Sequence, residues 1–111
     1  VGDGVSLVTI GGKGSLQIPF ACTITAATLL ADQSGSVVVD IWKDSYANYP
    51  PTVADTITAS AKPTLSTAIK SADSTLTGWA LSIVAGSILK FNIDSVSTIR
   101  QLTIVLNVTK T

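Results

Sequence analysis

Apolar and polar residues alternate at a period of two along several stretches of this chain, and this alternation restricts the fold more than any other feature. The clearest stretch is Ser36 to Trp42, in which Val37, Val39 and Ile41 share one face. Side chains of a β-strand point alternately to opposite faces of the sheet, so this face is predicted to lie in a hydrophobic core. The periodicity of an amphipathic helix is hard to find anywhere in the chain.

Further strand-like stretches are separated by Gly, Pro, Asp and Ser, which favour turns. These stretches are Val5–Ile10, Leu16–Phe20, Ile24–Leu30, Ser66–Ile69, Thr75–Ile83, Ile88–Ile93 and Gln101–Thr109. The glycine-rich run from Gly11 to Gly14 predicts a hairpin turn, Asp32–Gly35 predicts another, and Ala85–Ser87 a third. The segment Val53–Ala61 fits either a strand or a short helical turn.

About eight short strands at a spacing of roughly 8–12 residues are typical of two antiparallel sheets packed face to face. The sequence therefore predicts an all-β chain, specifically a single antiparallel β-sandwich domain over residues 1–111 with a jelly-roll-like arrangement. Because the chain contains no Met, we also expect it to be a fragment of a longer protein.

Charged residues make up 13% of the chain and hydrophobic residues 46%, whereas soluble domains usually carry about 25% charged residues. This apolar composition predicts that part of the surface meets another chain. The seven basic and seven acidic residues cancel, so no positive field marks a nucleic-acid partner. No apolar run approaches the ~18 residues that span a bilayer, so membrane insertion is not expected.

The residue types that most enzymes need are scarce. The chain has no His, which removes the usual base for a nucleophile such as Cys22 and the usual transition-metal ligand. We expect Cys22 to be a buried small hydrophobe. Asp40 and Asp44 are the nearest carboxylate pair, but in an extended strand they lie ~13 Å apart, beyond the separation that glycosidases use. The sequence therefore predicts a non-enzymatic protein without a cofactor.

Calcium binding is the remaining metal hypothesis, because Asp40, Asp44 and Asn48 carry oxygen ligands close together in sequence. Their spacing is not that of an EF-hand loop, and a solvated turn is the preferred interpretation. The run Gly11–Ser15 also lacks the spacing of a phosphate-binding loop.

Ligand binding is better supported in the aromatic loop that follows the Ser36–Trp42 strand. Flat aromatic rings can contact the apolar face of a sugar while carboxylates and amides bind its hydroxyls, and aromatic faces also anchor protein interfaces. The candidate ligand-binding residues are Trp42, Asp44, Tyr46, Asn48 and Tyr49. In the competing interpretation, Trp42 caps the core and Tyr49 packs on Pro50. We expect Trp79 and Phe91 to lie in the core.

Four segments of the chain resemble a domain that recurs in tail-fibre and other virion-associated proteins of tailed bacteriophages. They are LLADQSGSVVVDIWKDSYANYPPTVADTI at Leu29–Ile57, KPTLS at Lys62–Ser66, FNIDS at Phe91–Ser95 and LTIVLNVTK at Leu102–Lys110. The family often has Ala-Gly-Asp in the turn where this chain has Ser87 as the third residue, so no role is expected for a carboxylate there.

The resemblance implies a β-sandwich module of a phage particle, usually a trimer, that contacts host-surface glycans or other virion proteins. We therefore expect a homo-oligomeric tail-fibre or surface module in the virion, whose aromatic loop recognises a host-surface polysaccharide. The alternative is a purely structural domain that holds a trimer together or decorates a capsid or fibre without a ligand of its own.

Overall fold

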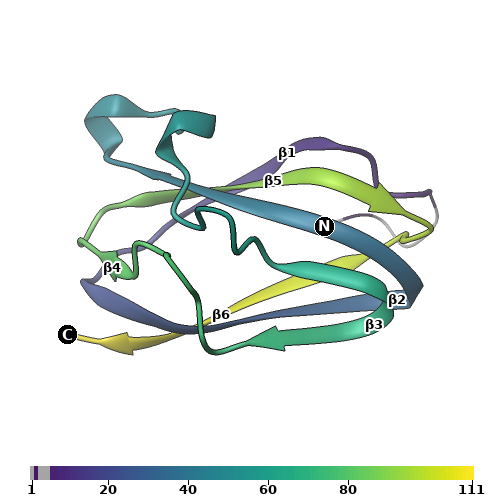
Figure 1. Ribbon diagram of the computed structural model, residues 1–111. Helices are drawn as coiled ribbons and strands as arrows, with labels where there is room; N and C mark the ends of the chain where they lie inside the picture. Colours follow the sequence, from purple (N-terminus) through teal and green to yellow (C-terminus); the bar gives the residue numbers. More distant parts are fainter. Residues whose placement is uncertain (1, 3–5) are drawn as a thin grey trace.

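The computed structural model describes residue 2 and residues 6–111. The described chain is all-β and every strand pair is antiparallel. Figure 1 shows its strands, which are β1 (Gly11–Gln17), β2 (Cys22–Asp44), β3 (Thr64–Asp73), β4 (Ser82–Ile83), β5 (Ile88–Ser97) and β6 (Leu102–Lys110). Two single 3-10 turns, η1 (Tyr46–Asn48) and η2 (Val53–Asp55), lie between β2 and β3.

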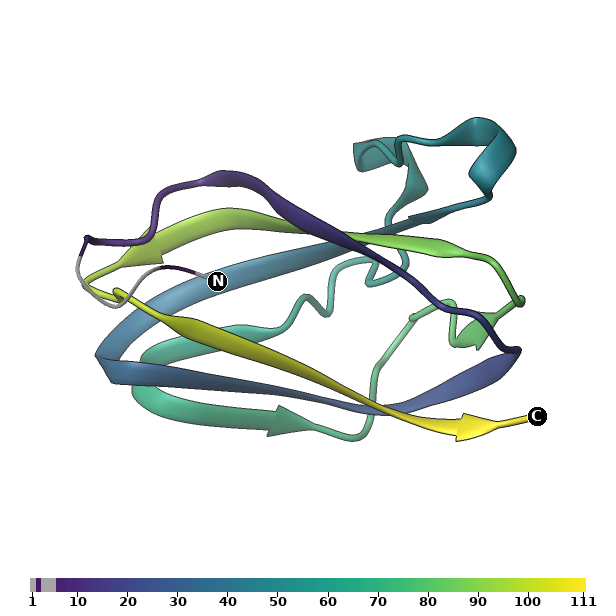
Figure 2. The same ribbon diagram turned by 180° about the vertical axis from the view of Figure 1, so that it is seen from behind.

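Strand β2 organises the whole molecule, because it is 23 residues long and belongs to two layers. Its first part, from Cys22 to Ala31, pairs with β6, and its last part, from Ser36 to Asp44, pairs with β5. Strand β3 runs beside both parts, while β1 extends the second layer beyond β5. Figures 1 and 2 show β2 bending sharply from the lower layer into the upper one.

The bend in β2 corrects the prediction of two strands separated by a turn at Asp32–Gly35. The strand continues through the bend because its polar groups find partners there: Oδ1 of Asp32 accepts hydrogen bonds from the backbone N–H groups of Arg100 and Gln101. Gly35 lets the Ser97 backbone approach closely, since a Cβ at this position would lie 2.5 Å from the carbonyl oxygen of Ser97. The described residues therefore form six strands, where about eight were predicted.

The prediction of a glycine turn before β1 was also wrong. Gly11 is the first residue of β1, and the glycines form a bulge in the strand, where the register with β5 shifts between Gly12 and Gly14. Gly11 and Gly14 have φ angles of 118° and 146°, which suit glycine and explain the residue type. The strand predicted at Val5–Ile10 is absent from residues 6–10, and Val5 lies outside the described residues.

The structure also answers the predictions for three other segments, which the sequence had left open or supported only weakly. Segment Val53–Ala61 begins as the 3-10 turn η2 and then contributes Thr56 to an isolated bridge with Trp42. Of the predicted strand Thr75–Ile83, only β4 is a strand. The turn at Ala85 and Gly86 and the two strands that follow it are confirmed, although β5 extends to Ser97.

The core lies between the two layers and consists of two clusters of buried apolar side chains. In each cluster, residues of both parts of β2 meet: Ile24 with Ile41 in one, and Leu29 with Val39 in the other. Each cluster therefore brings together the two parts of β2 on either side of its bend. Cys22 and Trp79 are buried in the first cluster, as predicted, and Phe91 packs against it half-buried.

Candidate functional site

A surface cleft of about 660 Å³ lies at the end of the molecule where β2 gives way to η1. Its lining includes the segment Lys43 to Ala47 and the turn Val84 to Ser87 between β4 and β5. Gln17, the last residue of β1, also lines it. Three segments that are far apart in sequence thus meet around one open cleft.

Hydrogen bonds hold the walls of the cleft in place. Nζ of Lys43 donates to the carbonyl oxygen of Ser82 at 2.7 Å, and Nε2 of Gln17 donates to the carbonyl oxygen of Gly86 at 3.4 Å. The turn itself is closed by the Ser87 hydroxyl, which donates to the carbonyl oxygen of Val84 at 2.7 Å. The end of β2 and the end of β1 are therefore both tied to the segment from β4 to β5.

The cleft combines exposed apolar surface with polar groups. The side chain of Tyr46 is 79% exposed and that of Val84 68% exposed, which leaves a flat ring and an aliphatic group open to a ligand. Asp44 also lines the cleft, and its Oδ1 accepts a hydrogen bond from the Ser45 N–H. A ligand with an apolar face and several hydroxyl groups fits this mixture.

The structure brings together only part of the predicted site. Asp44 and Tyr46 line the cleft. Asn48 and Tyr49 are exposed on η1 and just after it, and neither belongs to the lining. Trp42 is half-buried, and its indole ring lies under Nζ of Lys90, 5.7 Å from the ring centroid.

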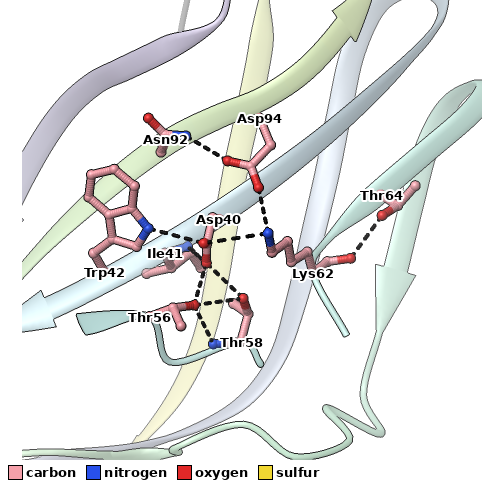
Figure 3. Close-up of polar contacts among 9 residues, drawn as sticks. All are labelled: Asp40, Ile41, Trp42, Thr56, Thr58, Lys62, Thr64, Asn92 and Asp94. Carbon is pink, nitrogen blue, oxygen red and sulfur yellow. Dashed lines mark hydrogen bonds and ion pairs between the residues drawn. The ribbon is translucent and has the colours of Figure 1, made fainter. Parts of the chain in front are cut away.

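Trp42 and Asp40 belong instead to a polar network beneath the segment that connects β2 to β3 (Figure 3). Asp40 is 1% exposed. Its Oδ1 accepts hydrogen bonds from the hydroxyls of Thr56 at 2.6 Å and Thr58 at 2.8 Å, and from the Ile41 N–H at 2.8 Å. Its Oδ2 accepts from Nε1 of Trp42 at 3.0 Å.

Burial alone would raise the pKa of Asp40, because it disfavours the charged form. Hydrogen bonds from Thr56, Thr58, Trp42 and the Ile41 N–H outweigh burial and hold the pKa below its ordinary value. The carboxylate thus stays ionised near neutral pH and has four donors around it. Asp40 is built to anchor the connecting segment, which does not suit the protonated acid of a glycosidase pair with Asp44.

A second carboxylate extends the network to the protein surface. Nζ of Lys62 donates to Oδ2 of Asp94 at 2.7 Å and lies 3.8 Å from Oδ2 of Asp40. Nδ2 of Asn92 donates to Oδ1 of Asp94 at 2.6 Å. The hydrogen bond to Asp94 is the main cause that raises the pKa of Lys62. Figure 3 shows Lys62 between the two carboxylates.

Gln17, Lys43 and Val84 also line the cleft and were not predicted as site residues from the sequence. The turn at Ala85–Ser87 was predicted, but its position near the end of β2 depends on how β4 and β5 pair with β2. The proximity of Lys43 to a predicted aromatic loop was the one signal in the sequence that could have included it.

In the described part of the chain, no three His, Cys, Asp or Glu side chains gather as a metal site. Residues 2 and 6–111 also contain no helix long and apolar enough to cross a bilayer.

Comparison with protein-family models, with curated proteins and with solved structures found no match for this chain.

Proposed function

We propose that this chain is a non-enzymatic module of a bacteriophage virion, in a tail fibre or on the particle surface, that recognises a host-surface polysaccharide at the cleft beside Tyr46. The cleft is the observation that supports the proposal, because the exposed residues Tyr46 and Val84 line it together with Asp44. Aromatic faces contact the apolar faces of sugar rings, and carboxylates accept hydrogen bonds from sugar hydroxyls.

The fold and the composition support the same proposal. We propose that the two layers are a β-sandwich with a jelly-roll-like arrangement, the architecture implied by the resemblance to phage virion domains. As a virion module, the chain would be held in place by copies of itself or by other virion proteins, consistent with its low content of charged residues.

The cleft is large enough for a small ligand or for part of a longer polymer. A volume of about 660 Å³ falls within the range of ligand pockets, roughly 300–1,000 Å³. The lining residues come from strand ends and turns that are hydrogen-bonded to one another, so the site is largely formed before a ligand arrives. A preformed site loses less entropy on binding.

The test is binding of the labelled protein to an array of bacterial surface polysaccharides and to intact bacteria. We expect saturable binding that the free polysaccharide competes away. Tyr46→Ala should weaken this binding about tenfold, since an aromatic contact contributes roughly 0.5–1.5 kcal/mol beyond its buried area. Asp44→Asn should weaken it as well, because the amide offers one acceptor oxygen in place of two.

Tyr49→Ala is the matched control, because Tyr49 is also an exposed tyrosine, 54% exposed, but does not line the cleft. Binding by this variant should equal that of the unmodified protein. A folded protein that binds no polysaccharide, or a Tyr49→Ala variant that loses as much binding as Tyr46→Ala, would contradict recognition at the cleft.

A further inference from the structure

The edge of the molecule formed by β1 and β6 carries a second surface feature, which shares no lining residue with the cleft. A groove of about 150 Å³, here called the edge groove, opens between the two layers. Its lining residues all have apolar side chains and include Leu16, Phe20, Phe91, Ile104, Leu106 and Val108. Figure 2 shows β1 and β6 as the nearer strands of the upper and lower layers in that view.

The apolar side chains at the mouth of the edge groove are open to water. Leu16 is 54% exposed, Val108 40% and Phe20 36%. An apolar cavity of about 150 Å³ can hold a group the size of benzene. One apolar side chain from outside would therefore fit in the groove and bury these three residues against it.

Strand β6 presents its backbone on the same edge. Among the described residues β6 pairs only with β2. The carbonyl oxygen of Asn107 accepts a hydrogen bond from Thr25 of β2, and the N–H of Thr111 donates to Ala21 just before β2. Backbone groups alternate sides along a strand, so those of Ile104, Leu106 and Val108 point away from β2, toward the edge.

The β6 side of this edge lacks the devices that usually stop strands from pairing with other chains. From Leu102 to Thr109, β6 contains no charged residue and no proline, and its irregular pairing with β2 comes from an extra residue in β2 at Thr25. By contrast, β1 carries Lys13 and a bulge. Exposed edges without charge, proline or bulge pair readily with another strand.

We propose that the β1–β6 edge is a self-association surface, and that a second copy of this chain binds there. The charges favour a second copy over a charged partner, because the chain has seven basic and seven acidic residues and two copies do not repel each other. The only charged residue of β6, Lys110, lies at its end, with Nζ 5.8 Å from the Phe20 ring centroid.

The sequence of β6 also suits pairing with itself. In an antiparallel pair centred on Leu106, Leu106 would face its own copy and Ile104 would face Val108, so apolar residues oppose one another. Lys110 would lie far from the Lys110 of the other copy. An arrangement of three copies that places β6 of one against β1 of the next would bury the same groove.

The test is the molar mass of the protein by light scattering over a range of concentrations. We expect a mass at least twice that of the 11.4 kDa chain. Leu16→Asp and Val108→Asp should each lower the association constant at least a hundredfold, because they place a charge in an apolar interface. Ile69→Asp is the matched control: Ile69 is 53% exposed on β3, at the opposite end of the strand order, and its substitution should leave the mass unchanged.

Circular dichroism shows whether each variant is folded. If an aspartate variant unfolds, Val108→Thr keeps the branched shape and should still weaken association severalfold. A monomer at every concentration would overturn self-association, as would an oligomer that Ile69→Asp dissociates and the groove variants do not. The inference is independent of glycan recognition, because a monomer that binds polysaccharide normally would overturn only self-association.

Discussion

The hydroxyl of Thr58 donates a 2.8 Å hydrogen bond to Oδ1 of Asp40, although 18 residues separate them. Both side chains are buried, with Thr58 0% and Asp40 1% exposed. The bond joins strand β2 to the segment that follows it. This segment passes through η1 and η2 and returns to β2 at the Trp42–Thr56 bridge. A charged acceptor strengthens such a bond, so this contact fixes the base of the segment that carries Tyr46.

Thr58→Val should lower the free energy of unfolding by about 1–3 kcal/mol, since it preserves the shape of the side chain and removes one donor to a buried carboxylate. Urea denaturation followed by tryptophan fluorescence measures the change. Thr64→Val is the control, because its hydroxyl is exposed and donates to the carbonyl oxygen of Lys62. That variant should change stability by less than about 0.5 kcal/mol. Equal effects of the two variants would contradict the anchoring role of Asp40.

Acid should destabilise the protein through Asp40. The pKa of Asp40 in the folded protein lies below its ordinary value of 3.8, so the stabilisation is complete above that value and is lost as the pH falls through the folded-state pKa. The free energy of unfolding, measured by urea titration from pH 6 downward, should fall below about pH 4. The fall should be smaller in Asp40→Asn.

Part of the acid sensitivity should survive in Asp40→Asn, because a second carboxyl acts in the same direction. The backbone N–H groups of Gln101 and Arg100 lower the pKa of Asp32, with the Gln101 bond the largest cause. An Asp40→Asn variant with the same pH profile as the unmodified protein would contradict the assignment to Asp40.

Lys62 should contribute little to stability in spite of its two carboxylate neighbours. Its side chain is 33% exposed and that of Asp94 26% exposed, and exposed ion pairs typically contribute 0–1 kcal/mol. Lys62→Met keeps most of the aliphatic chain and should cost less than about 1 kcal/mol. The cost should shrink further in 0.5 M salt, whereas the cost of Thr58→Val should stay the same. A loss above about 2 kcal/mol would show that the pair is desolvated.

Gly35→Ala should destabilise the bend in β2. A Cβ there would lie 2.5 Å from the Ser97 carbonyl oxygen and 2.7 Å from Cγ1 of Ile99, so the connection between β5 and β6 has to move. We expect a loss of about 1–3 kcal/mol, the usual cost of overpacking, in the midpoint of thermal or urea unfolding. The neighbouring exposed residue provides the control: Ser34→Ala should be nearly neutral. A neutral Gly35→Ala would mean that the bend is looser than this packing requires.

Local alternation was enough to predict the strands whose faces differ most in polarity. β5 and β6 were located from the alternation of Leu89 and Ile93 with Lys90 and Asn92, and from the equally regular pattern after Leu102. These strands have one buried face, so a one-residue slip would expose the whole core set. The same pattern correctly placed Val37, Val39 and Ile41 in the core.

The continuity of β2 could not be read from the residues around its bend. Asp32–Gly35 has the composition of a turn, and only its partners from residues 97–101 allow the strand to pass through it. The glycines of β1 were predicted to form a turn, because a bulge and a turn require the same backbone freedom.

The candidate site was half predicted because its two walls depend on different kinds of information. Asp44 and Tyr46 follow directly after a strongly patterned strand. Val84 and Gln17 reach the cleft through the pairing of β4 and β1 with strands far away in sequence. Trp42, by contrast, was predicted as a site residue, but its indole N–H donates to the buried carboxylate of Asp40, two residues away.

Because β2 belongs to both layers, the order of synthesis sets when this protein can fold. The partners of β2 in the two layers, β5 and β6, come after every other described strand in the sequence. A nascent chain that ends at Ser87 would carry β2 with β3 and β4 as its only strand partners among the described residues. The chain therefore completes its core only after Leu102–Lys110 has left the ribosome, and until then the long strand is open to any chaperone or neighbouring chain that binds extended apolar segments.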